Sequence, residues 1–156
     1  MSELSVFFDT SVLLAGIFEL GTPEDPAQRL MDAVAKGHFQ RPQTAWHCCL
    51  ELYSVATRLP KELRVTPAVA ARLVEEEVVE RFRICSLPRD RRLPFIRSAA
   101  HDAVVGGRLY DAHIGEIARL TGADVVATEN RRHFTSLMRH GVRVLTAAEL
   151  AEEAGL

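Results

Sequence analysis

Short apolar segments alternate with helix-forming segments along this chain. Strand character is found at residues 4–8, 38–41, 82–87, 124–128 and 142–145. Helical patterns occupy residues 11–18, 26–36, 44–59, 67–81, 93–105, 111–122, 132–140 and 147–154, and two of them begin at the N-cap and proline pairs Asp25-Pro26 and Thr66-Pro67. Strands and helices that alternate in this way form a parallel sheet covered on both faces. We therefore predict an α/β fold of three layers, α/β/α, around a central, mainly parallel sheet of about four to five strands.

The size and charge of the chain exclude several classes of protein. Its 156 residues fit one domain, 1–156, and a formal charge of −2 gives no overall attraction for nucleic acid. The three cysteines, two of them neighbours, predict reduced thiols that fill the core. No apolar run is long enough for a membrane span, and the first residues lack a basic start. These features predict a cytoplasmic protein.

A carboxylate interrupts the most apolar stretch, residues 6–14, where Asp9 follows the first predicted strand. A buried carboxylate without partners is costly, so it becomes neutral or finds a cation. In parallel sheets, ligands bind beyond the carboxyl ends of the strands, which is where Asp9 lies. By itself the position allows three roles for Asp9: a covalent nucleophile, a metal ligand, or the N-cap of the following helix.

Three further polar residues are candidates for the same site. Asn130 follows the predicted strand 124–128 and so belongs at the same edge of the sheet. Glu51 lies on a narrow helical stripe with His47, where a solvated ion pair is the alternative. Asp111 begins a helix, where stabilisation of the helix N-terminus is the alternative.

Several acids at one site repel one another unless a cation neutralises them. Carboxylate oxygens suit Mg²⁺ or Mn²⁺, and such a site can activate water for attack on a phosphodiester. A zinc site is not expected, because the six histidines include no pair at i,i+4 spacing and each is expected to be a surface or packing residue.

Four segments resemble those of PIN-domain proteins, specifically VapC-type toxin ribonucleases. FDTSVLL at 8–14 resembles the opening strand with its first metal-binding Asp, and Glu51, in the helix after PQT at 42–44, matches the second acid. GGRLYDAHI at 106–114 carries the third acid, Asp111, and VATENRRHF at 126–134 resembles the segment that ends in Phe. The resemblance covers essentially the whole chain. Asn130 departs from it, since many PIN domains have a fourth Asp there.

The resemblance implies a metal-dependent endoribonuclease. In this interpretation Asp9, Glu51 and Asp111 hold Mg²⁺ or Mn²⁺, and Asn130 orients water or a ligand, with one negative charge fewer at the site. The hydroxyls of Thr10, Ser11 and Thr128 would bond the carboxylates or a substrate phosphate. Glu129 is expected to point elsewhere.

The same resemblance implies partners. RNA is the expected substrate, a VapB-like antitoxin the expected protein partner, and a homodimer the expected assembly, with no membrane. Phosphate contacts are assigned to Arg131 and Arg132 beside the site, and with less positional support to Arg89, Arg91, Arg92 and Arg97. A dimer interface could use apolar residues of the early helices, although core packing explains them as well: Val12, Leu13, Ile17, Phe18 and Leu30.

Two alternatives stay open. A hydrolase of the haloacid dehalogenase type also has an Asp after its first strand, but the second Asp of that pattern is Ser11 here, and neither of the two lysines, Lys36 and Lys61, fits. A non-catalytic PIN-like binding module would retain the acids for folding or partner contact, and Asn130 favours it modestly. The sequence does not reveal which RNA is the target.

Overall fold

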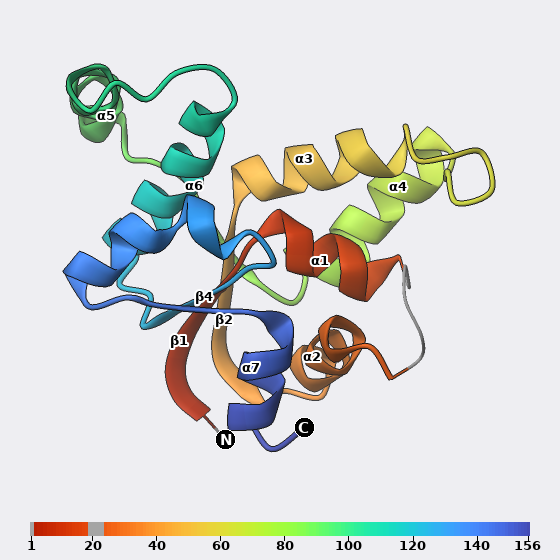
Figure 1. The fold of residues 1–156 in the computed structure, drawn as a ribbon. Helices are drawn as coiled ribbons and strands as arrows, with labels where there is room; N and C mark the ends of the chain where they lie inside the picture. Colours follow the sequence, from red (N-terminus) through yellow and green to blue (C-terminus); the bar gives the residue numbers. More distant parts are fainter. Residues whose placement is uncertain (1, 19–23) are drawn as a thin grey trace.

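Five parallel strands form the central sheet of the computed structural model, which describes residues 2–18 and 24–156 (Figure 1). Their order is β3-β2-β1-β4-β5, so the first strand lies in the middle. Each neighbouring pair is parallel, for example Val6 opposite Pro42 and Phe7 opposite Val126. The bounds are β1 (Ser2–Phe8), β2 (Phe39–Ala45), β3 (Arg83–Cys85), β4 (Val125–Ala127) and β5 (Arg143–Leu145).

Helices cover both faces of this sheet (Figure 1). Helices α1, α2 and α7 pack together beside one face, with α3 and α4 next to α1, while α6 contacts β2 and carries α5 on its outer side. The predicted three-layer α/β/α fold is confirmed. The bounds are α1 (Thr10–Ile17), α2 (Pro26–Ala35), α3 (Trp46–Ala56), α4 (Pro67–Leu73), the π-helical turn η1 (Val74–Val79), α5 (Arg89–His101), α6 (Arg108–Leu120), the 3-10 turns η2 (Arg131–His133) and η3 (Thr135–His140), and α7 (Ala147–Glu153).

The apolar character of β1 follows from its central position. Phe7 and Phe8 point to opposite faces, and both are completely buried. Phe8 contacts Phe39 and Phe82 edge-on, with ring centroids 5.7 and 5.3 Å apart. Each buried aromatic contributes about 1.5–3 kcal/mol relative to an exposed one. The sheet is thus anchored around the strand that ends at Asp9.

Several predicted boundaries were wrong. Strand β2 continues past Pro42 to Ala45. Proline is tolerated there because β3 pairs only with Gln43 to Ala45, so no residue of β3 needs an N–H from Pro42. The expected helix 44–59 begins at Trp46, because Thr44 is held in the strand and its hydroxyl donates a 2.7 Å hydrogen bond to Phe8 O.

The sequence predicted a helix only from residue 93, but α5 begins at Arg89. Asp90 in its first turn favours the helix N-terminus, and arginine is a good helix former. Residues 131–140 form 3-10 turns instead of one helix. The arginines of 89–97 therefore lie on a helix.

The proposed use of early-helix residues in a dimer interface is not supported. Val12, Leu13 and Leu30 are completely buried, and Ile17 and Phe18 pack against the same core. Exposed apolar side chains lie elsewhere, and those on α3, α5 and α6 are Trp46, Leu50, Tyr53, Leu93, Ile96 and Tyr110.

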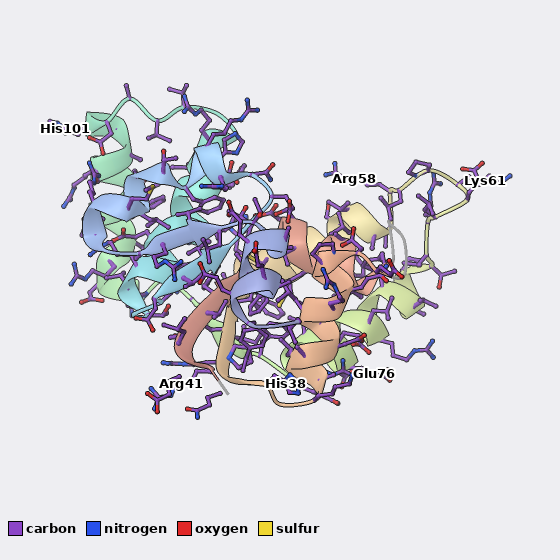
Figure 2. The ribbon with its side chains drawn as sticks, turned by 60° about the horizontal axis from the view of Figure 1, so that its bottom comes forward. His38, Arg41, Arg58, Lys61, Glu76 and His101 are labelled. Atoms are coloured by element: carbon purple, nitrogen blue, oxygen red, sulfur yellow. The ribbon has the colours of Figure 1, made fainter. Side chains whose placement is uncertain are left out.

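Charged side chains project from the edges of the molecule. In Figure 2, Arg58 and Lys61, in the connection after α3, project from one end and His101, the last residue of α5, from the other. In the described ranges, no helix is long and apolar enough to span a membrane.

The three thiols are buried and unpaired, as expected. Burial raises the pKa of the Cys48 thiol to about 12 and that of Cys49 to about 11, so both are protonated at neutral pH. We expect iodoacetamide at pH 7.5 to leave the native protein unmodified for an hour, as measured by intact mass. The protein unfolded in urea should take up three labels, one for each cysteine. Rapid labelling of the native protein would contradict the burial of these residues.

Candidate active site

Asp9 lies at the carboxyl end of β1 and is 4% exposed. Its Oδ2 accepts hydrogen bonds from the hydroxyls of Ser11, at 2.9 Å, and Thr128, at 2.8 Å. Asp9 occupies the N-cap position of α1, but its side chain does not cap the helix. The two hydroxyls therefore fix the carboxylate between the start of α1 and the loop after β4.

Burial raises the pKa of Asp9, because it penalises the charged form. The hydrogen bonds from Thr128 and Ser11 act in the opposite direction, and the negative charge of Glu51 raises the pKa further. Asp9 and Glu51 are thus close enough to repel each other. A cation between them would remove this repulsion and compensate for the lost hydration.

Two histidines lie next to Glu51. His47 Nε2 lies 3.0 Å from Glu51 Oε1, which realises the expected i,i+4 pair, and His47 Nδ1 lies 2.8 Å from His113 Nδ1. Burial, together with the nearby His47 and Arg92, lowers the pKa of His113. A neutral His113 can share one proton with His47, whose other nitrogen faces the carboxylate. Helices α3 and α6 therefore both contribute side chains around Glu51, although its Oε1 is buried without a hydrogen-bond partner among the described residues.

Asp111 has a different partner. Its Oδ2 lies 2.8 Å from Nδ1 of His133, in turn η2. The side chain of Asp111 is 29% exposed and that of His133 is 30% exposed. Asp111 lines a cavity between α5, α6 and η3, whereas Glu51 lines another between α3 and α6. In residues 2–18 and 24–156, no group of three or more His, Cys, Asp or Glu side chains could hold a metal ion. The structure thus brings Asp9 and Glu51 together but does not add Asp111 to them.

The residues around Asp9 form a short hydrogen-bonded network. Thr128 Oγ1 accepts from the Asn130 N–H, and Ser11 Oγ accepts from the Glu129 N–H, both at 3.0 Å. Asn130 is exposed and directly follows this network. The hydroxyl of Thr10, expected to bond a carboxylate or phosphate, is buried without a hydrogen-bond partner in the described residues.

The side chain of Glu129 points away from the site, as predicted. Its Oε1 accepts a 2.9 Å hydrogen bond from the N–H of Ala147, at the start of α7. Glu129 therefore stabilises a helix N-terminus, and the acids available near Asp9 do not include it.

The arginines differ in their freedom to bind phosphate. Arg131 forms a 2.7 Å ion pair with Glu149, while the exposed Arg132 forms none within the described chain. Among the same residues, no ion pair involves the four exposed arginines of α5: Arg89, Arg91, Arg92 and Arg97. Helix α5 therefore offers the larger unpaired positive surface.

Sequence reasoning missed the roles of His113 and His133. Both were expected to be surface or packing residues, yet one supports His47 and the other pairs with Asp111. No local pattern could have revealed these contacts, because His47 and His113 are 66 residues apart. Only the neighbouring position of their helices brings them together.

A model of the PIN domain family matches residues 5–132, most of the chain. The chain belongs to the PIN domain family. This match includes Asp9, Glu51, Asp111 and Asn130.

Relatives and solved structures extend this result. The chain is 36% identical to ribonuclease VapC27 of Mycobacterium tuberculosis over 102 residues, which is 65% of this chain and 72% of that protein. It is 29% identical to ribonuclease VapC40 of the same species over 123 residues, covering 79% and 85%. The DNA-bound VapBC structure from Salmonella typhimurium shares the fold, with a TM-score of 0.63, 19% identity, and coverage of 92% and 98%. The resemblance to VapC-type PIN proteins is confirmed.

Proposed function

We propose that this protein is a Mg²⁺- or Mn²⁺-dependent endoribonuclease, the toxin of a VapBC-type toxin–antitoxin pair. The observation that carries the proposal is Asp9, a buried carboxylate at the carboxyl end of the central strand with a second acid, Glu51, near it. The ribonuclease names of its relatives VapC27 and VapC40 support the reaction.

The donor set fits a hard divalent cation. Asp9 and Glu51 would hold it through carboxylate oxygens, and Asp111 would join them as a third ligand on leaving His133. When bound, such a cation lowers the pKa of water and stabilises charge on a phosphodiester. Asn130 is assigned to orienting a water molecule, as an uncharged replacement for a fourth acid.

The chain's own residues contribute positioning and charge. Ser11 and Thr128 both donate to Asp9 Oδ2, so the other oxygen, Oδ1, is free of these two bonds. The phosphate backbone of RNA would contact Arg132 and the arginines of α5. Arg131, held by Glu149, is a weaker candidate because binding would compete with that ion pair.

A VapB-like antitoxin is the proposed protein partner. Structures that share the fold include VapBC from Salmonella typhimurium bound to DNA, and the FitAB complex bound to a DNA fragment. The predicted homodimer stays a prediction, and sedimentation of the purified protein would test it.

Digestion of total RNA tests the proposed activity. The purified protein is incubated with RNA in Mg²⁺, Mn²⁺ or EDTA, and new ends are mapped by sequencing. We expect discrete cleavage with either metal, none with EDTA, and none with Asp9→Asn. Cleavage that persists in EDTA or with Asp9→Asn contradicts the proposal. Metal binding without any cleavage would favour the non-catalytic PIN module.

The pairing of Asp111 with His133 leads to a separate prediction. Because the imidazole competes with a cation for the carboxylate, His133→Ala should strengthen Mn²⁺ binding by about two- to fivefold, the range for a partly exposed ion pair. Isothermal titration calorimetry measures this directly. The control is His140→Ala, an exposed histidine of η3 that contacts no carboxylate among the described residues. If His133→Ala binds Mn²⁺ as tightly as the wild type does, or more weakly, then the pair with His133 does not keep Asp111 from binding the metal.

A further inference from the structure

A second feature of the site is a cavity of about 640 Å³ that opens beside Glu51. It lies between α3 and α6, and the segment before α5 closes one side. Its lining is mostly apolar or aromatic, with one cation. The residues relevant here are Trp46, Leu50, Glu51, Arg92, Tyr110 and His113.

Two aromatic side chains at this cavity are exposed to an unusual degree. Trp46 is 49% exposed and Tyr110 is 58% exposed, although large aromatics are normally covered. The ring of His47 holds Tyr110 in an edge-on contact, with centroids 5.5 Å apart. The cavity therefore presents flat aromatic faces to solvent, next to a proposed metal ligand.

The charge around this cavity is positive on one side. Arg92 lines it, and its Nε donates only a long 3.4 Å hydrogen bond to Leu87 O. Arg89 and Arg97 lie on the same helix, α5, whereas Arg91 lines the cavity beside Asp111, and none of the three forms an ion pair in the described chain. A ligand that matches both features must be flat and apolar in one part and anionic in another.

A single-stranded nucleic acid has this combination. Its unpaired bases stack on aromatic side chains, and its phosphates bind arginine. A protein partner would need both apolar side chains and a row of acids, whereas every nucleotide carries a base and a phosphate together.

We infer that this cavity binds one unpaired base of the RNA, stacked against Trp46 and Tyr110, with an adjoining phosphate on Arg92. The inference rests on the proposed function and adds to it a base-binding cavity beside Glu51. Because Glu51 borders the cavity, a base held there places a neighbouring phosphodiester close to the acids.

Trp46 is the only tryptophan, so its fluorescence reports on this cavity alone. The protein is titrated in EDTA with octauridylate or octaadenylate, and with a double-stranded RNA and an abasic oligomer of equal length. We expect at least one of the two single strands to quench Trp46. The duplex and the abasic oligomer should bind more weakly and leave the fluorescence nearly unchanged.

Variants locate the stacking contact. Tyr110→Ala should weaken binding of the quenching oligomer by about tenfold or more, the usual loss for one stacked base. Tyr110→Phe keeps an aromatic ring and should bind like the wild type. The control is Tyr53→Ala, an exposed tyrosine of α3 that does not line the cavity. Circular dichroism shows whether each variant is folded.

Several results would overturn the inference. One is equal binding of the abasic oligomer and both single strands, with Trp46 unquenched. Another is a Trp46 fluorescence that changes when the protein is diluted in the absence of RNA. This result would show that the cavity is a contact between two copies of the chain. Metal-dependent cleavage that needs Asp9 but is unaffected by Tyr110→Ala would remove this inference and leave the proposed function intact. Quenching of Trp46 by a single strand without any RNA cleavage would support this inference and contradict the proposed function.

Discussion

The Asp9→Asn variant is expected to unfold at a higher temperature than the wild type in metal-free buffer at pH 7, although it loses RNA cleavage. Burial raises the pKa of Asp9 above its value of 3.8 in an unfolded chain, so ionisation of Asp9 weakens the folded state. An uncharged amide removes this cost. Each kcal/mol gained raises the Tm of a chain this long by about 2–4 °C.

The pH dependence distinguishes this cause from a general packing effect. Well below pH 3.8, Asp9 is protonated in both the folded and the unfolded chain, so the stability difference between the wild type and the variant should be smallest at the lowest pH. As the pH rises from there through the higher pKa of the folded protein, the wild type loses stability relative to the variant. Thermal unfolding followed by circular dichroism between pH 3.5 and 8 measures the difference.

Divalent metal should reverse the order of stability. Mn²⁺ at about 100 times its Kd stabilises the wild type by about 2.7 kcal/mol, whereas Asp9→Asn lacks one proposed ligand and should respond little. Thr128→Val is a useful comparison, since it removes one hydrogen bond to Asp9 but keeps the charge. If Asp9→Asn is less stable than the wild type at pH 7 without metal, Asp9 is not a destabilising buried charge.

Gly16→Ala is expected to destabilise the protein by about 1–3 kcal/mol, the usual cost of overpacking. Helices α1 and α2 approach closely at Gly16, where an added Cβ would overlap the side chain of Met31 and lie 2.6 Å from the carbonyl oxygen of Ala27. Met31 can rotate, but the backbone of Ala27 moves only if α2 moves. Urea unfolding gives the free energy of unfolding.

Gly115→Ala is the matched control, because Gly115 is also buried within a helix, α6. A Cβ there would lie 3.6 Å from the ring of Phe134, an ordinary contact. Removing a glycine from a helix interior contributes about 0.5–1 kcal/mol, so this variant should be neutral or slightly more stable. The same effect for both substitutions would refute the close approach of α1 and α2.

Local signals in the sequence predicted much of the fold. Asp25 and Thr66 were expected to begin helices, and their side chains accept hydrogen bonds from Ala27 N and Val69 N. The carboxyl end of the central strand was correctly placed because Val6, Phe7 and Phe8 form a continuous apolar run, as expected of a strand buried on both faces. The strand begins two residues earlier than predicted, at Ser2. Pro42 misled the prediction, since only the short length of β3 makes a proline acceptable there.

The candidate site was predicted only in part. Asp9 could be recognised because a carboxylate that interrupts a buried stretch violates a local rule. The pair of Glu51 with His47 was expected from their i,i+4 spacing, whereas the contact of His47 with His113 and the pair of Asp111 with His133 could not be predicted from the sequence. That the arginines of α5 form no ion pair among the described residues, unlike Arg131 with Glu149, could not be predicted either, because an ion pair depends on the folded chain.

The sequence by itself therefore determined the order of strands and helices, the capped starts of α2 and α4 and the position of Asp9, because these depend on residues within one or two turns of each other. The tertiary structure alone decided which side chains from distant segments surround each acid. Ser11 and Thr128 meet at Asp9 from positions 117 residues apart, and His113 reaches His47 across 66 residues. Such contacts exist because parallel pairing places the ends of β1 and β4 side by side, and because α6 packs against the sheet next to α3.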